Sequence, residues 1–223
     1  MRMLKVCGAR TLADIELLAA AGADYVGLWH GVPGGHAELS VAEVTELAAA
    51  ARDTGRLRPV LVTFSSDVDL LADVLERSGI RWLQLHAYQP PAVVRGLRKR
   101  FPDDLTIVKV VHLSDGYCVE RPLIRSYERA GTDLFLLDKV TEDGRIGSTG
   151  QRLRGAEIAE LVPLFTRPFV LAGGISAHNK ADYDGVVDHP RFYGIDVDSA
   201  ARDEVGRFQL AFVTQLRQGW RTA

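Results

Sequence analysis

Eight short β-rich segments alternate with eight helical patterns along the 223 residues, and this alternation constrains the fold more than any other feature. We predict strands at 3–7, 24–29, 58–64, 81–86, 106–112, 133–138, 168–173 and 192–197. We predict helices at 11–22, 40–55, 67–79, 90–101, 119–131, 154–165, 176–186 and 199–219. Strands that alternate with helices pair in parallel through right-handed crossovers. Eight such units in a chain of this length predict a single domain, a (β/α)8 TIM barrel over residues 1–223.

The ends of several predicted helices carry recognisable capping residues. Ser40 and Ser66 are predicted N-caps, and Thr11 suits the same role, because a side-chain oxygen at this position accepts an otherwise free backbone N–H. Glycine adopts the left-handed conformation that ends a helix at no steric cost, and it stands at the expected helix ends 22, 55, 79 and 131. The predicted helix at 176–186 is the least regular, since it is short and polar.

Composition limits the classes of partner. The net charge is −2, and the short basic run at 95–100 suits a solvated helix end, so we expect no nucleic-acid partner. Two cysteines build no disulfide framework, which favours a reducing compartment. No apolar run approaches the length of a membrane span, and the N-terminus has no signal-peptide pattern. We therefore expect a soluble cytoplasmic protein, monomeric or homodimeric, without a membrane partner.

Polar residues collect at the carboxyl ends of the predicted strands, the rim where parallel barrels carry their chemistry. They are Cys7, His86, His112, Asp138 and Asp196. Each has a simpler interpretation: the cysteine as a small core residue, the aspartate as a cap, and the histidines as hydrogen-bonded residues of the barrel top. Their shared location favours an active site at this rim.

Three glycine-rich or helix-initiating turns follow the last three strands. They lie at 144–153, 171–176 and 194–204, and their backbone N–H groups are suited to an anion. A phosphate between the last two strands is common in this fold. The simpler interpretation is that these three segments are only tight turns. The chain has no P-loop and no GxGxxG motif, so no nucleotide cofactor is indicated.

Several blocks of the chain resemble phosphoribosylanthranilate isomerase, a family of tryptophan biosynthesis. In order they are LKVCGARTLADIELLAAAGADYVGL, WLQLHA, FLLDKV, GSTG, FVLAGGIS and YGIDVDSA, and together they span nearly the whole chain. The resemblance implies an Amadori rearrangement of an N-(5-phosphoribosyl)amine to a 1-amino-1-deoxyribulose 5-phosphate, without cofactor or metal. It also implies that Cys7 is the general base and Asp138 the general acid.

The resemblance extends to the binding residues. It places substrate-binding roles on Gln84 and His86, and phosphate-binding roles on Gly147, Ser148, Thr149, Gly150, Gly173, Gly174, Asp198, Ser199 and Ala200. The implied partner is therefore a small phosphorylated sugar amine.

Lys5 and Cys7 share one face of the first strand, and we expect both to point into the barrel. We also expect the thiol to be exposed enough to ionise, with its pKa lowered by nearby helix N-termini.

The chain departs from the family after the second predicted strand. The family usually has Ser-Pro-Arg-x-Val-Ser there, and its arginine pairs with the anthranilate carboxylate, whereas this chain reads WHGVPGGHAELS. Aligned on Ser40, the arginine position is Ala37, and a methyl group forms no bidentate pair with a carboxylate. Either His36 replaces the arginine as a substrate-binding residue, or the amine has changed while the phosphoribosyl chemistry has not.

Two other functions remain open. One is a metal-dependent sugar-phosphate epimerase with His86, His112, Asp138 and Asp196 as a ligand ring, although the His-x-Asp pair typical of such epimerases is absent after the second strand. The other is a non-catalytic protein that kept the phosphate-binding turns at 144–153, 171–176 and 194–204, which we call the phosphate cup.

Overall fold

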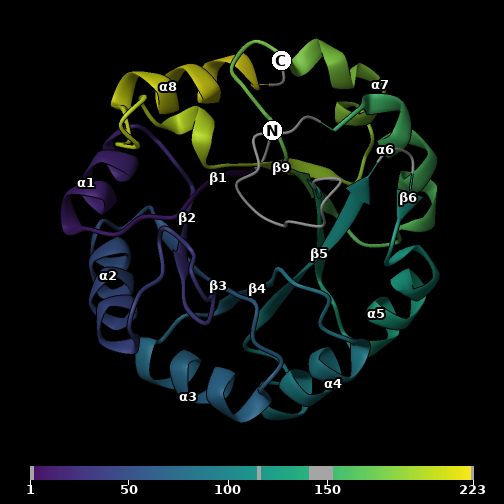
Figure 1. The fold of residues 1–223 in the computed structure, drawn as a ribbon, viewed down its shortest axis with the longest axis horizontal. Coiled ribbons are helices and arrows are strands. Elements are labelled where there is room, and N and C mark those ends of the chain that lie inside the picture. Colours follow the sequence, from purple (N-terminus) through teal and green to yellow (C-terminus); the bar gives the residue numbers. More distant parts are fainter. Residues whose placement is uncertain (1–2, 115–116, 141–152, 222–223) are drawn as a thin grey trace.

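The computed structural model describes residues 3–114, 117–140 and 153–221. Within these residues eight parallel strands form a closed barrel, and the pairing of β4 with β5 completes the ring (Figure 1). The strands are β1 (Met3–Cys7), β2 (Tyr25–Trp29), β3 (Arg58–Thr63), β4 (Trp82–Leu85), β5 (Thr106–Ser114), β7 (Leu134–Lys139), β8 (Phe169–Leu171) and β9 (Phe192–Val197). The predicted barrel is confirmed, and each predicted strand corresponds to one of these.

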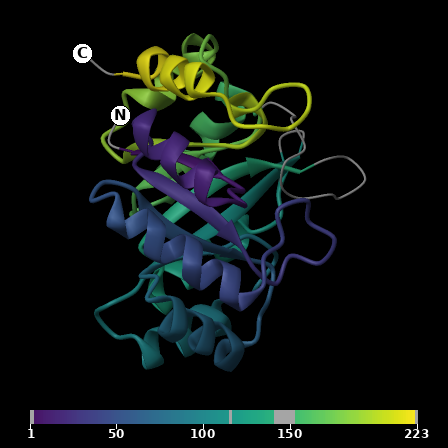
Figure 2. The ribbon, with the colours of Figure 1, turned by 90° about the vertical axis from the view of Figure 1, so that its left-hand side faces the viewer.

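The helices surround the barrel on its outside (Figures 1 and 2). They are α1 (Leu12–Ala20), α2 (Val41–Asp53), α3 (Val68–Ser78), α4 (Pro91–Arg100), α5 (Ile124–Ala130), α6 (Gly155–Leu161), α7 (Asp184–Val187) and α8 (Leu210–Gly219). Short 3-10 segments lie at η1 (Arg121–Leu123), η2 (Val162–Leu164), η3 (Lys180–Tyr183) and η4 (Ser199–Ala201). No helix of the described residues is long and apolar enough to cross a membrane.

Three predicted helices differ from the structure. The segment at 176–186 contains only η3 and the four-residue α7, which fits its polar sequence. The segment at 199–219 starts with the single turn η4, and its long helix begins only at Leu210. The segment at 119–131 begins with η1, and the proline within that turn, Pro122, has no N–H to donate. A two-residue strand, β6 (Tyr117–Cys118), precedes it and pairs antiparallel with the end of β5.

Alternation along the strands separates an outer from an inner set of side chains. Leu4 and Val6 of β1 pack toward the helices, in the large apolar layer outside the sheet. Met3 and Cys7 belong to the smaller apolar set inside the barrel. Lys5 shares their face and lies in register with Asp196 of β9. The period of two therefore brings a lysine, a thiol and a carboxylate into the barrel at the seam between the first and last strands.

The observed N-caps agree with the predicted ones with one exception. Thr11 and Ser40 each form a capping box, in which an acidic side chain of the first turn binds back to the cap backbone. The cap of α3 is Asp67 and not Ser66, because the Asp67 carboxylate accepts the backbone N–H groups of Asp69 and Leu70. The predicted Ser66 cap is therefore wrong by one residue.

This correction predicts the effect of two neighbouring substitutions. We expect Asp67→Ala to lower the free energy of unfolding by about 1 kcal/mol, because two N–H groups of the first turn lose their acceptor. Ser66→Ala serves as the control and should stay within about 0.5 kcal/mol of the parent. Urea unfolding followed by circular dichroism measures both. A larger loss in Ser66→Ala than in Asp67→Ala would contradict the assignment.

Candidate active site

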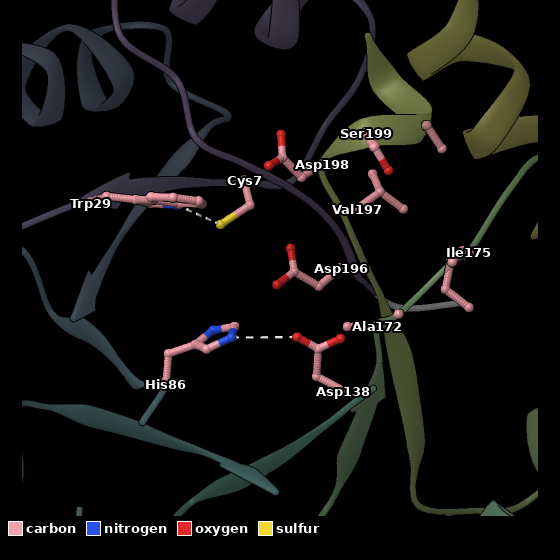
Figure 3. A pocket seen from close by; sticks show the side chains of 13 residues that line it. Cys7, Trp29, His86, Asp138, Ala172, Ile175, Asp196, Val197, Asp198 and Ser199 are labelled. Atoms are coloured by element: carbon pink, nitrogen blue, oxygen red, sulfur yellow. Dashed lines mark hydrogen bonds and ion pairs between the residues drawn. The ribbon is translucent and has the colours of Figure 1, made fainter. Parts of the chain in front are cut away.

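A pocket opens at the carboxyl ends of the barrel strands (Figure 3). Cys7 of β1 and Asp138 of β7 both line it, and in Figure 3 Asp196 of β9 lies between them. The other lining residues are Trp29, His86, Ala172, Gly173, Gly174, Ile175, Val197, Asp198, Ser199 and Ala200. The thiol and the carboxyl that the sequence singled out thus share one pocket on the predicted rim.

The Cys7 sulfur receives two N–H donors. The Lys5 ammonium lies 3.2 Å from Sγ, and the indole Nε1 of Trp29 lies 3.0 Å from it. Gly27 of β2 leaves the room for this arrangement, since a Cβ there would come 2.5 Å from Sγ and 3.2 Å from Nζ of Lys5. A side chain at position 27 would therefore displace both groups.

Lys5 connects the thiol to a buried carboxylate. Its ammonium lies 2.7 Å from Oδ2 of Asp196, and both side chains are almost fully buried. Burial alone would lower the pKa of Lys5, but the charges of Asp196 and Cys7 outweigh it and the pKa is raised. Burial raises the pKa of Asp196 to about 6 in spite of the lysine. Lys5 therefore stays charged at neutral pH, where it can stabilise an anion on Sγ.

The thiol is not in the environment that we expected from the sequence. Cys7 is only 7% exposed, and burial raises its pKa to about 12 while the Lys5 charge and the Trp29 hydrogen bond oppose that rise. The expectation of an exposed thiol with a lowered pKa is wrong, because desolvation disfavours the thiolate more than the neighbouring donors favour it. Lys5 is the charged donor at Sγ, in place of the expected helix N-terminus.

Asp138 of β7 is held by its own strand and by His86, which follows β4 on the far side of β5. Its Oδ1 accepts the backbone N–H of Lys139 at 2.8 Å, and its Oδ2 lies 3.4 Å from Nε2 of His86. The Gln84 amide lies 2.9 Å from Nδ1 of His86, and as an N–H donor there it leaves the ring proton on Nε2, facing Asp138. Burial lowers the pKa of His86, so its ring is neutral.

The predicted phosphate cup is described only in part. Gly173 and Gly174 take left-handed φ angles of 71° and 66°, and a Cβ on Gly173 would come 2.9 Å from the Lys139 nitrogen. Ser199 and Ala200 lie in the short turn η4, so the helix N-terminus expected there is only a single 3-10 turn. Gly147, Ser148, Thr149 and Gly150 lie outside the described residues.

Asp198 brings a carboxylate to the same part of the pocket. Arg202 donates to its Oδ1 at 2.6 Å and also to the backbone oxygens of Cys7 and Gly8, at 3.3 and 2.8 Å. The guanidinium lies over the Phe208 ring, 3.7 Å from its centroid. Arg202 therefore offsets the charge of Asp198 and ties the segment after β9 to the end of β1.

The loop after β2 places the residues that depart from the family. Ala37 is fully buried, and a Cβ on Gly8 would lie 3.4 Å from the Ala37 methyl. The His36 ring is half exposed, with its Nε2 3.4 Å from Oδ2 of Asp198 and its ring edge against Trp29. His30 faces the loop itself, since its Nδ1 lies 2.8 Å from the Leu39 oxygen.

The structure thus gathers most, but not all, of the residues that the sequence proposed. His36 and Gln84 are not among the lining residues: His36 lies at the rim of the mouth, and Gln84 is buried beneath His86. His112 points toward Glu120, with 2.7 Å between Nδ1 and Oε1, and it is not part of the pocket lining. Within the described residues no three His, Cys, Asp or Glu side chains are placed to hold a metal ion, so the ligand ring finds no support in this geometry.

Sequence reasoning placed Trp29 at the end of the second strand without giving it a role, and it missed Arg202. The signal for Trp29 was available, because it follows Gly27 by two residues and so shares the inward face of β2. The signal for Arg202 was weaker. Its spacing of four from Asp198 suits an ion pair on a helix, but it does not show contacts with β1.

A closed parallel barrel whose mouth carries a thiol, carboxyls and an imidazole has the architecture of a (β/α)8-barrel enzyme. The chain belongs to the N-(5'-phosphoribosyl)anthranilate isomerase family, whose model matches residues 4–216.

Individual relatives agree with this assignment. The chain is 30% identical to the N-(5'-phosphoribosyl)anthranilate isomerase of Afipia carboxidovorans, over 92% of this chain and 82% of the relative. It is also 30% identical to the isomerase of Haloarcula marismortui, over 93% and 94%. A solved phosphoribosylanthranilate isomerase from Thermus thermophilus superposes with a TM-score of 0.78 at 22% identity, covering 98% of each chain. At that identity the superposition shows the fold alone.

The Lys5 contact predicts the reactivity of the thiol. Removing the ammonium in Lys5→Met takes away the charge that lowers the pKa of Cys7, so the thiolate fraction at a fixed pH should fall about tenfold or more. Iodoacetamide alkylation of the Cys7 peptide, followed by mass spectrometry, measures this. Lys109→Met is the control, because Lys109 is buried on β5 and donates to the backbone oxygens of Ala87 and Val110. Equal alkylation of Cys7 in the parent and in Lys5→Met would show that the ammonium does not act on the thiol.

Proposed function

We propose that this protein is a cofactor-free isomerase that converts N-(5'-phosphoribosyl)anthranilate, by an Amadori rearrangement, to the 1-amino-1-deoxyribulose 5-phosphate, as a step of tryptophan biosynthesis. The observation that carries the proposal is the placement of Cys7 and Asp138 at the ends of two different strands in one pocket. Family membership supports it. A related isomerase, with a TM-score of 0.76 and 21% identity over 99% of this chain, has been solved with reduced 1-(o-carboxyphenylamino)-1-deoxyribulose 5-phosphate.

The first step is opening of the furanose. The protonated Asp138 carboxyl donates its proton to the ring oxygen, the bond from that oxygen to C1 breaks, and the amine nitrogen supplies the electron pair that forms a Schiff base. Donation requires a protonated carboxyl at neutral pH. The ring of His86, 3.4 Å from Oδ2 of Asp138, is neutral.

The second step is removal of the C2 proton by the Cys7 thiolate. The electron pair of the C–H bond forms the C1=C2 bond of an enaminol, and return of a proton to C1 with loss of the O2 proton completes the ketone. A thiolate of high pKa is a strong base, and the Lys5 ammonium at 3.2 Å offsets the cost of forming it in a buried pocket. The base stands on a strand end, and this rigid support fits the positional demands of proton transfer.

The phosphate end of the substrate lies, in this proposal, against Gly173, Gly174 and the η4 turn. The family resemblance adds Gly147, Ser148, Thr149 and Gly150, which lie outside the described residues. Gly173 and Gly174 have left-handed φ angles and line the pocket together with Ser199 and Ala200, and backbone N–H groups of such turns can bind an anion. The partner is thus a small phosphorylated sugar amine, and the cytoplasm is the compartment that fits this metabolism. A monomer or a homodimer fits the family, since the isomerase of Thermotoga maritima is named as dimeric.

A different amine is the second candidate. The expected arginine position is the buried Ala37, and the neighbouring His36 lies 3.4 Å from the carboxylate of Asp198. A carboxylate already beside His36 competes with a second one on the substrate. The phosphoribosyl half of the site keeps its acid, base and turns, so this candidate alters only the amine.

Growth of a tryptophan auxotroph that lacks the isomerase separates the two candidates. We expect complementation by the parent gene if the amine is anthranilate. Failure of the parent to complement, together with turnover of another N-(5-phosphoribosyl)amine by the purified protein, would assign the second candidate. Absence of turnover with every such amine would contradict the proposed chemistry itself.

Substitution of the two reacting groups tests the mechanism. Cys7→Ser keeps nearly the same volume but loses the easily ionised group, so turnover should fall about 100-fold or more while the affinity for a phosphorylated ligand changes little. Asp138→Asn removes the transferable proton and should lose a similar factor. Steady-state kinetics with purified variants measures both. Near-normal turnover in Cys7→Ser would remove Cys7 from the role of base.

The phosphate cup predicts product-like inhibition by a simple anion. Inorganic phosphate should compete with the substrate, raising the apparent KM without changing kcat, because it occupies the place of the ribose 5-phosphate group. Gly173→Val should weaken this competition, since its side chain would enter the space beside Lys139 and Asp138 and strain a left-handed residue. Phosphate inhibition that changes kcat alone would show binding elsewhere.

A further inference from the structure

The indole of Trp29 is directed at the proposed base. Its Nε1 lies 3.0 Å from the Cys7 sulfur, and the side chain is only 8% exposed (Figure 3). β2 neighbours β1, and the pairing of Cys7 with Gly27 places Trp29 one inward position closer to the mouth. The hydrogen bond therefore joins two adjacent strands at the level of the pocket where the chemistry is proposed to occur.

The two groups at the Cys7 sulfur suit its thiolate form better than its thiol form. The indole N–H and the Lys5 ammonium are donors without an acceptor lone pair, so neither can accept an S–H proton. A thiolate accepts from both, whereas a neutral thiol must turn its own proton elsewhere. We propose that Trp29 is a positioning residue of the base, whose indole N–H stabilises the Cys7 thiolate and fixes its direction in the pocket.

The loop that departs from the family pattern holds this indole in place. The Leu39 N–H donates to the Trp29 carbonyl at 2.9 Å, and the His36 ring packs edge-on against the indole with 4.7 Å between centroids. A Cβ on Gly35 would lie 3.1 Å from Cε3 of Trp29, so the glycine permits the close approach of the loop. The segment 30–39 thus packs against the Trp29 side chain and supports its position.

The charges around the sulfur set the direction of the expected shift. Besides Trp29, the thiol is faced by Lys5 on its own strand and by the β9 side of the mouth, where the charged groups are Asp196, Asp198 and, at the Cys7 carbonyl, Arg202. Burial and the two carboxylates raise the pKa of Cys7, while Lys5 and the Trp29 hydrogen bond lower it. Loss of the indole N–H therefore raises this pKa.

The test is Trp29→Phe, which keeps an aromatic ring and removes the donor. We expect the pKa of Cys7 to rise by about one unit, which lowers alkylation by iodoacetamide about tenfold at a fixed pH below that pKa. The alkylation rate of Cys7, followed against pH below that pKa with Cys7→Ser as the blank, reports the same shift. Trp82→Phe is the matched control, because Trp82 also points into the barrel but packs against Tyr25 at the opposite end. An unchanged Cys7 pKa in Trp29→Phe would overturn the proposal.

A measurement on the unaltered protein covers the case in which Trp29→Phe does not fold. In a nitrogen-15-labelled sample, the indole N–H resonance of Trp29 should move with the titration of Cys7. The resonance of Trp220, whose indole donates to the Ser176 carbonyl, should stay in place. A Trp29 resonance that does not respond while Cys7 titrates would contradict the proposal.

Kinetics then connect the thiol to the reaction. This step rests on the proposed isomerase function, whereas the titrations above do not, so the two can fail separately. We expect Trp29→Phe to lower kcat about tenfold at neutral pH with little change in KM, and to regain activity as the pH is raised. A loss of activity that is equal at every pH, with an unchanged thiol titration, would make Trp29 only a wall of the pocket.

Discussion

The buried ion pair between Lys5 and Asp196 is the interaction on which the rest of the site depends. It joins the first and last strands of the barrel, in register and 2.7 Å apart, and its Asp196 lines the pocket. Removing two charges from water costs several kcal/mol each, and the attraction between them roughly offsets that cost, so such a pair is weak evidence for stability. Its value lies in placing a permanent positive charge beside the Cys7 sulfur.

Opposed forces act on the proposed base as a result. A pocket dry enough to strengthen electrostatic interactions also disfavours the thiolate, and burial dominates in the free protein, with a pKa of about 12 for Cys7. Lys5 and Trp29 recover part of that cost through direct donation to sulfur. Asp138, the proposed acid, lies in the same pocket beside the neutral ring of His86. The proposed chemistry needs a proton on this carboxyl and an ionised thiol on Cys7.

The loop at 30–39 contains the sequence that departs from the family, and its contacts show what these residues do in this structure. Ala37 fills a small buried space against Gly8, His36 turns to Asp198, and the loop as a whole supports Trp29. Arg202 braces the same region from the far end of the chain. The change therefore involves more than an exchanged substrate contact, since the segment that lacks the arginine also positions a donor to the proposed base.

Much of the fold followed from local pattern, because strand alternation and helix capping depend on residues close together in the sequence. The eight strands, the inward face shared by Lys5 and Cys7, and the Thr11 and Ser40 caps all belong to this class. The predicted Ser66 cap was wrong because the adjacent Asp67 takes that role. The predicted helix at 199–219 was wrong in its first half, where the left-handed Gly206 and the bridge between Arg202 and Phe208 precede α8.

The sequence by itself determined the barrel and the rim at which polar residues collect, since period-two strands and their ends can be read residue by residue. The roles of base for Cys7 and acid for Asp138 came only from the resemblance to the family. Only the tertiary structure decided the ionisation environment of Cys7, because burial and charge at the sulfur are sums over groups from several strands. The Trp29 donor and the Arg202 contact with β1 were decided there too. The first depends on the pairing of β1 with β2, and the second joins residues 195 positions apart that closure of the barrel brings together.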